Sequence, residues 1–181
     1  YFFHSYTLYI LNLMARKIIY FINPVSGTNG KESLIKLIEK KTTSQNIPFE
    51  ILHTNPQGDY FFLKQKIEDE NITDIVICGG DGTVSQVAGS LIDEAVNIGI
   101  IPMGSGNGLA LAAKIPTNPS KALDLIFNGK ASYIDSFFIN QTFSCMLCGL
   151  GFDARVAHDF AKQNTRGLMT YVKQCIGNFF A

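Results

Sequence analysis

A single carboxylate stands in a glycine-rich turn at residues 79–83, which read GGDGT. Glycines let the main chain approach an anion closely, and the helix expected to follow offers unpaired N–H groups at its start. A carboxylate beside phosphates is electrostatically out of place unless it binds through Mg²⁺ or takes a proton from a nucleophile. The turn therefore predicts a phosphate site in which Asp81 handles a metal ion or a proton.

A second glycine-rich turn follows a short apolar run at residues 98–102. It contains Gly104, Ser105, Gly106, Asn107 and Gly108. Ligands of open α/β sheets bind beyond the carboxyl ends of the parallel strands, so turns at the ends of successive strands face one crevice. We expect both turns to belong to the same site.

Short apolar runs alternate with helix-like segments and must position these turns. The strands are expected at 17–23, 48–52, 75–78 and 98–102, and the helices at 31–41, 60–70, 83–92, 107–114 and 120–128. Thr83 is expected as the residue that caps its helix, and Phe61 as an apolar contact of the helix at 60–70. This alternation predicts a Rossmann-like, doubly wound α/β fold, in which a parallel sheet carries helices on both faces.

The pattern changes near residue 130, where two strand-like runs at 131–139 and 142–148 predict a β-hairpin. We expect a nucleotide-binding α/β domain at 14–129 and the start of a β-rich second domain at 130–181, which stops short of completion. Asp135 lies inside an apolar run and needs a partner or a functional reason there. Cys145 and Cys148 are expected as core cysteines of a strand rather than as a zinc site.

Composition excludes some classes of partner. The chain has 15 basic and 15 acidic side chains, so it lacks the basic excess typical of a nucleic-acid binder. Its four cysteines fit a reduced, cytoplasmic protein. Residues 1–13 are apolar and uncharged but too short to span a membrane. We interpret them as a non-native or disordered extension, and a membrane-surface anchor is the alternative.

Neither the P-loop pattern nor the dinucleotide-binding pattern G-x-G-x-x-G is present. Instead, four motifs follow one another: NPVSG at 23–27, GGDGT at 79–83, PMGSGNGLA at 102–110 and GLGFDARV at 149–156. In this order and spacing they resemble the diacylglycerol kinase catalytic-domain family of lipid kinases. That family includes the bacterial YegS-like and diacylglycerol kinases and the sphingosine and ceramide kinases.

The resemblance implies ATP between a Rossmann-like domain and a β-sandwich, and Mg²⁺-dependent transfer of the γ-phosphoryl group to a lipid hydroxyl, that of diacylglycerol or a related lipid. It also implies a cytoplasmic protein that contacts the membrane surface transiently, and a homodimer is a further option. Asp81 matches the family's GGDG aspartate and is the expected catalytic residue; no metal ligand is assigned. The residues expected around the nucleotide are Asn23, Pro24, Ser26, Gly27, Thr54, Gly79, Gly80, Asp81, Gly82, Thr83, Gly104, Ser105, Gly106 and Asn107.

One departure from the family pattern lies just after the first glycine turn. Gln86 stands where family members usually carry glutamate, which removes a negative charge one helical turn from the expected phosphates. Two alternatives to a lipid kinase stay open. GGDG alone also suits NAD kinases, and the departure at Gln86 suits a non-catalytic module that binds nucleotide or lipid.

Overall fold

The structure is a computed structural model, and some expected site residues lie outside the part it describes. Pro24, Ser26 and Gly27 are outside it, as is the segment 1–13. Of the first glycine-containing loop, only Asn23 can therefore be placed. The structure describes residues 16–23, 31–55, 57–146, 149, 151–163 and 168–179.

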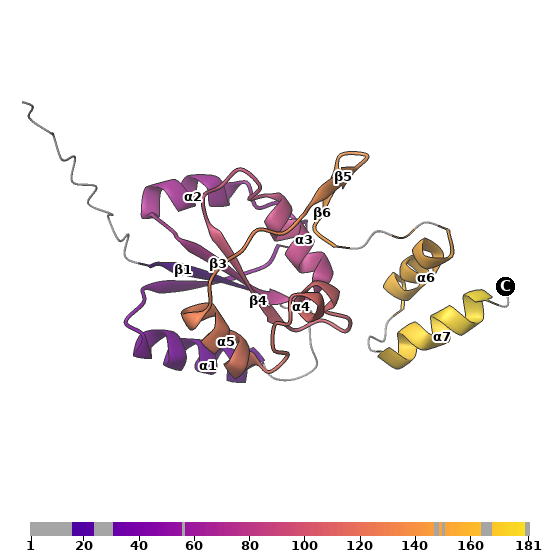
Figure 1. The fold of residues 1–181 in the computed structure, drawn as a ribbon, viewed down its shortest axis with the longest axis horizontal. Helices are drawn as coiled ribbons and strands as arrows, with labels where there is room; N and C mark the ends of the chain where they lie inside the picture. Colours follow the sequence, from indigo (N-terminus) through magenta and orange to yellow (C-terminus); the bar gives the residue numbers. More distant parts are fainter. Residues whose placement is uncertain are drawn as a thin grey trace, which may run out of the picture.

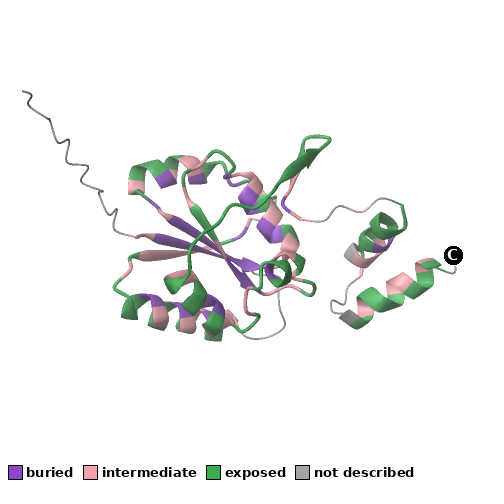
Figure 2. Cartoon of the chain, in the orientation of Figure 1, coloured by how far each residue is buried: buried purple, intermediate pink, exposed green. Residues whose placement is uncertain are grey.

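Four parallel strands form the central sheet in the order β2-β1-β3-β4 (Figure 1). They are β1 (Ile18–Ile22), β2 (Phe49–His53), β3 (Asp74–Gly79) and β4 (Asn97–Pro102). Every residue of β1 and β3 is buried, as expected of central strands covered on both faces (Figure 2). The predicted parallel sheet is confirmed.

Helices cover both faces of this sheet (Figure 1). On one face, apolar side chains of α1 (Lys31–Ser44) and α5 (Pro119–Asn128) join one core cluster. On the other, side chains of α2 (Phe62–Glu70), α3 (Asp81–Gly89) and α4 (Gly108–Ala112) join a second cluster. Successive side chains along a strand point to opposite faces of the sheet, so each strand contributes to both clusters. The doubly wound arrangement is confirmed.

A short antiparallel hairpin follows the α/β unit. It joins β5 (Phe137–Ile139) to β6 (Thr142–Ser144). Both turn residues, Asn140 and Gln141, have positive φ angles of 47° and 68°, as a two-residue type I′ turn requires. The hairpin is confirmed, although each strand is shorter than predicted. Beyond it lie α6 (Phe152–Ala161) and α7 (Leu168–Phe179).

Four local expectations were wrong. Gly80, not Thr83, caps α3, because the chain is extended at Gly80 and turns helical at Asp81. Phe61 is 74% exposed, since it precedes the first turn of α2. Asp135 is exposed and lies outside β5, so water solvates it and no buried partner is needed. Cys145 is a core cysteine as predicted, and only its place in a strand was wrong, because it follows β6. Cys148 is outside the described residues.

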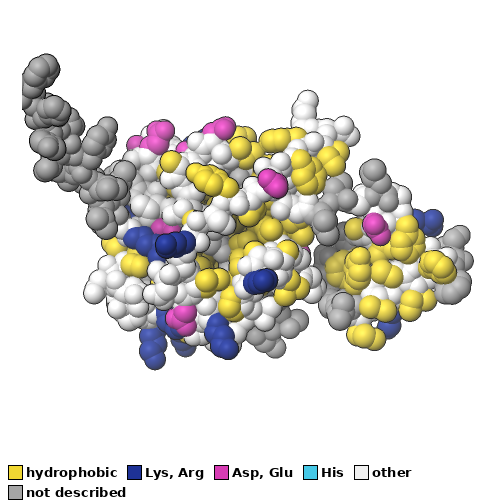
Figure 3. Space-filling model, viewed as in Figure 1, with side chains coloured by type: hydrophobic (Ala, Val, Ile, Leu, Met, Phe, Trp, Pro, Cys, Tyr) yellow, Lys and Arg dark blue, Asp and Glu magenta, His cyan; other side chains and the backbone are white. Residues whose placement is uncertain are grey.

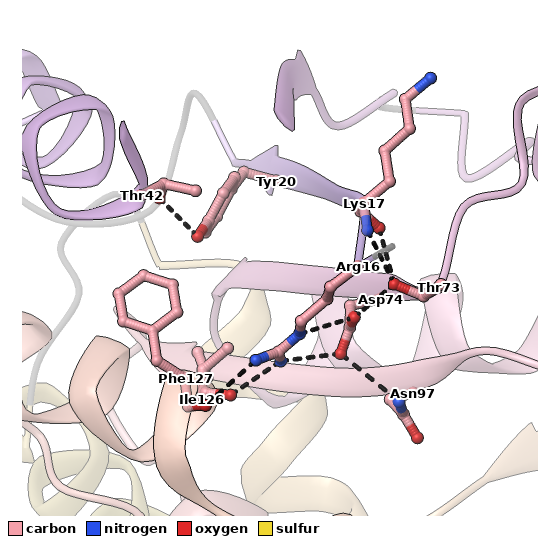
Figure 4. A network of polar contacts seen from close by, with 9 residues as sticks. All are labelled: Arg16, Lys17, Tyr20, Thr42, Thr73, Asp74, Asn97, Ile126 and Phe127. Atoms are coloured by element: carbon pink, nitrogen blue, oxygen red, sulfur yellow. Dashed lines mark hydrogen bonds and ion pairs between the residues drawn. The ribbon is translucent and has the colours of Figure 1, made fainter. Parts of the chain in front are cut away.

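An ion-pair network ties the amino ends of the strands to α5 (Figure 4). The guanidinium of Arg16 donates to both carboxylate oxygens of Asp74, at 2.9 Å each. It also donates to the carbonyls of Ile126 at 2.7 Å and Phe127 at 3.2 Å, near the end of α5. Hydrogen bonding to Asp74 raises the pKa of Arg16. The network lies at the amino ends of the strands, whereas the glycine turns lie at their carboxyl ends.

Candidate functional site

The two glycine turns meet main chain to main chain. A Cβ added to Gly104 would lie 2.5 Å from the Cα of Gly80, and one added to Gly80 would lie 3.0 Å from the Cα of Gly104. A side chain at either position would force the turns apart. Hydrogen bonding between the ends of β3 and β4 sets this approach, since Met103 N–H donates to Gly79 O at 2.9 Å. The structure thus brings both turns to one place, as predicted.

The amino end of α3 lies in the first of these turns. Gly80 is its cap residue and has no side chain that could accept from the first N–H groups of the helix. Those groups, on Asp81, Gly82 and Thr83, have no partner within the helix and carry the positive end of its dipole. A Cβ added to Gly82 would meet nothing within 4 Å. The turn is therefore suited to an anion such as a phosphate.

The carboxylate of Asp81 bridges the two turns. It accepts from Gly108 N–H at 2.9 Å through Oδ2 and from Leu109 N–H at 3.2 Å through Oδ1. Both donors belong to the first turn of α4. Asp81 lies where predicted, and its catalytic role stays a prediction.

Asn107 holds the second turn in shape. Its side-chain oxygen accepts from Gly104 N–H at 2.8 Å, and its side-chain nitrogen donates to Gly104 O at 2.8 Å. The residue has a φ of 53°, a left-handed conformation that asparagine tolerates better than most residues. Its amide is thus engaged within the turn. Ser105 and Gly106, between these residues, are exposed.

The ends of β1 and β2 complete the edge of the sheet. Asn23 donates from its side-chain amide to the Thr83 hydroxyl at 2.8 Å, which joins the end of β1 to α3. Thr54 N–H donates to Ile22 O at 3.1 Å and so lies at the same edge beside β1. Gly79 is pressed against Thr83, whose Cβ would lie 2.8 Å from a Cβ at Gly79. All predicted site residues within the described part therefore gather along the carboxyl ends of the four strands.

Sequence reasoning missed Tyr60, which holds the loop that contains Thr54. The Tyr60 hydroxyl accepts from Asn55 N–H at 3.1 Å and donates to Asn55 O at 3.4 Å. Its ring packs edge-on against Phe21, with ring centroids 5.6 Å apart. Burial raises the pKa of Tyr60. The sequence did hold a signal for this role, because Tyr60 directly follows a loop that contains asparagine, proline and glycine.

The hairpin packs on α3 and the residues just after it reach the site, which the sequence did not indicate. Phe143 of β6 packs on Gly89 of α3, where an added Cβ would lie 3.0 Å from the ring. Met146 touches the second glycine turn, with its Cε 3.2 Å from a Cβ placed on Gly108. The segment after the α/β unit is therefore docked against α3 and α4.

The site offers neither a metal cage nor a thiolate in the part of the chain that the structure describes. No three His, Cys, Asp or Glu side chains gather closely enough there to hold a metal ion. Cys78, next to the first glycine turn, is buried, and burial raises the pKa of its thiol to about 12. It stays protonated near neutral pH and is not a nucleophile. Gln86 is exposed and lies beside Gly58 of the loop after β2.

The chain is similar to known proteins in sequence and in fold. Residues 17–139 match the model of the family described as "Diacylglycerol kinase catalytic domain". A probable YegS-like lipid kinase from Serratia proteamaculans is 28% identical over 137 residues, which are 73% of this chain and 45% of that protein. A diacylglycerol kinase from Staphylococcus carnosus is 26% identical over 145 residues, which are 79% of this chain and 47% of that protein.

An uncharacterized protein from Synechocystis is 30% identical over 162 residues, which are 83% of this chain and 37% of that protein. A crystal structure of a diacylglycerol kinase from Bacillus anthracis superposes with a TM-score of 0.61 at 25% identity, over 71% of this chain and 45% of that one. The chain spans less than half the length of these relatives. The family match covers most of the α/β unit and reaches the hairpin. The chain belongs to the diacylglycerol kinase catalytic domain family.

Proposed function

We propose that this protein is the nucleotide-binding part of an ATP-dependent lipid kinase, which transfers a γ-phosphoryl group to a lipid hydroxyl. One observation carries the proposal: two glycine turns touch through Gly80 and Gly104 beside the uncapped start of α3. Phosphoryl transfer needs positioning and stabilisation of charge more than covalent chemistry from the protein. Main-chain N–H groups in such a turn supply both.

Magnesium enters this proposal with the nucleotide. The described residues form no metal cage, and Asp81 uses its carboxylate on main-chain N–H groups. Mg²⁺ usually keeps several waters and binds through one or two carboxylates together with the phosphates of the substrate. We therefore propose that ATP arrives as its magnesium complex and that the chain holds mainly the phosphates.

The acceptor is proposed to be diacylglycerol or a related lipid. The support is the family, whose relatives include a diacylglycerol kinase and probable lipid kinases. A lipid acceptor requires transient contact with a membrane surface, which we propose for a protein that is cytoplasmic and peripheral. Among the described residues, no helix combines the length and apolar character needed to cross a bilayer.

The test is transfer of label from [γ-³²P]ATP with Mg²⁺ to diacylglycerol, phosphatidylglycerol, sphingosine, ceramide or NAD, with the longest encoded form of the protein. The variant is Gly104→Ala, whose Cβ would lie 2.5 Å from the Cα of Gly80. We expect it to reduce transfer by at least about tenfold, since small displacements in a phosphate site are costly. The matched control is Gly177→Ala in α7, where an added Cβ meets nothing within 4 Å.

A labelled lipid, lost in Gly104→Ala and kept in Gly177→Ala, would support the proposal and name the acceptor. Label on NAD alone would support an NAD kinase instead. ATP binding without labelling of any acceptor would leave a nucleotide-binding module, the alternative that Gln86 favours.

A further inference from the structure

The Asp81 carboxylate poses an electrostatic problem at a site suited to phosphates. Negative charge near phosphates is unfavourable unless something compensates it. In the structure, compensation comes from the main chain of the second glycine turn, because Gly108 and Leu109 donate to the carboxylate at 2.9 and 3.2 Å. Hydrogen bonds from N–H groups to a carboxylate are stronger than those between neutral groups.

The second turn depends on this contact because, although Met146 also touches Gly108, the turn's other hydrogen-bonded supports lie elsewhere. Asn107 fixes Gly104, at the beginning of the turn. Ala110 is 2% exposed and, with Leu109, packs into the core, which fixes α4 beyond its first residue. Asp81 alone among these side chains links the turn to α3. Gly106 is also close, with 3.4 Å between an added Cβ and Oδ2 of Asp81.

We propose that Asp81 is a positioning residue, whose carboxylate holds the turn at 104–108 in register with α3 so that both turns meet the nucleotide phosphates. This inference rests on the proposed nucleotide site, and it gives the carboxylate a role other than accepting a proton or coordinating a metal. Loss of the carboxylate frees the first N–H groups of α4 and lets the second turn drift from the first. The primary effect falls on nucleotide affinity.

The test compares Asp81→Asn and Asp81→Ala with the unmodified protein. Asparagine keeps one acceptor oxygen and loses the charge, while alanine loses both hydrogen bonds. Affinity for the non-hydrolysable ATP analogue adenylyl imidodiphosphate is measured by calorimetry with Mg²⁺. We expect about a tenfold loss for Asn and a larger loss for Ala, as for charged hydrogen bonds. The matched control is Asp69→Asn on α2, which removes a charge from an exposed side-chain pair with Gln65.

A second readout follows the contact itself. Hydrogen exchange of the Gly108 and Leu109 amides is measured by NMR in each variant. We expect both amides to lose protection in Asp81→Asn and Asp81→Ala, while the amides of β1 and β3 keep theirs. A variant that simply fails to fold would lose protection everywhere, and that result would overturn the local role proposed for Asp81.

The outcomes separate this inference from the proposed function. Unchanged analogue affinity in Asp81→Asn would overturn it, most clearly if kcat for lipid falls while KM for ATP stays constant, as expected for a proton acceptor. Unchanged protection of Gly108 and Leu109 would also overturn it. If the unmodified protein binds the analogue but labels no lipid, the kinase proposal fails, and analogue affinity still decides the role of Asp81. No binding of the analogue by the unmodified protein would overturn both.

Discussion

The side-chain amide of Asn23 donates to the hydroxyl of Thr83 across 2.8 Å, although the two residues are 60 positions apart in the chain. The bond joins the end of β1 to the first turn of α3. Thr83 is 8% exposed, so few waters can replace the bond if it is lost. The first glycine turn is therefore anchored from both sides, by Asn23 and by the approach of Gly104 to Gly80.

Thr83→Val tests this anchor, because valine keeps the shape of threonine and removes the acceptor. We expect the free energy of unfolding to fall by about 1 kcal/mol, the usual contribution of one hydrogen bond, and ATP affinity to fall with it. Urea unfolding and calorimetry measure the two effects. Thr43→Val, on the exposed side of α1, is the control and should change unfolding by less than about 0.5 kcal/mol. Equal effects of the two substitutions would contradict the anchor.

Arg16→Met tests the network at the opposite edge of the sheet. It leaves the carboxylate of Asp74, which is 4% exposed, without its bidentate partner. Asp74 is buried although Arg16 is about one-third exposed, and leaving a buried carboxylate without its main donor should lower the free energy of unfolding by about 2 kcal/mol. Lys17→Met is the matched control, because the Lys17–Glu70 pair is about one-third exposed and should cost less than about 1 kcal/mol. A loss from Arg16→Met as small as that control's would show that the network adds little stability.

Tyr20→Phe tests why the free energy of unfolding should fall at alkaline pH. Burial raises the pKa of Tyr20 from 10.0 to about 12, and its hydroxyl bonds to the buried Thr42 hydroxyl at 2.8 Å. The folded state thus favours the neutral phenol, so its contribution is complete below pH 10 and is lost as pH rises toward 12. Two pH units correspond to about 3 kcal/mol.

Tyr20→Phe should therefore flatten the pH dependence of unfolding between pH 10 and 12, beyond a constant loss from the broken hydrogen bond. Burial also raises the pKa of Cys78 to about 12, so part of the pH dependence of unfolding should remain in the variant. Tyr133→Phe is the control, because Tyr133 is fully exposed. The measurement is urea unfolding at a series of pH values, and an unchanged slope in Tyr20→Phe would exclude this tyrosine as the cause.

Gly89→Gln tests the docking of the hairpin on α3. A Cβ at Gly89 would lie 3.0 to 3.3 Å from Phe143, so the ring or the strand must move. Overpacking of this kind costs about 1–3 kcal/mol, and we expect faster hydrogen exchange in β5 and β6. Gly177→Gln has open space around the new side chain and should stabilise α7, because glycine is a poor helix former. Unchanged exchange in the hairpin would show that Phe143 does not hold it.

The sequence alone determined the α/β class, the four strands and the two glycine turns. Short runs of β-branched residues such as 75–77 favour buried strands, and glycines mark where the chain must turn tightly. It also determined that the turns share one edge, since parallel strands place their carboxyl ends together. The ends of the elements were predicted less well. Thr83 was predicted to cap a helix that in fact begins at Asp81, because residue propensities do not reveal that the backbone is extended at Gly80.

Only the tertiary structure decided which groups the polar side chains of the site bind. The partners of Asp81 lie 27 and 28 positions away, and that of Asn23 lies 60 away, so no local pattern encodes these bonds. Likewise, the spacing of residues predicted Asp135 in a buried strand, whereas packing left it in water. Hydrogen-bond geometry and burial depend on where segments distant in the sequence meet. Those meeting points are set only when all the strands have paired in register.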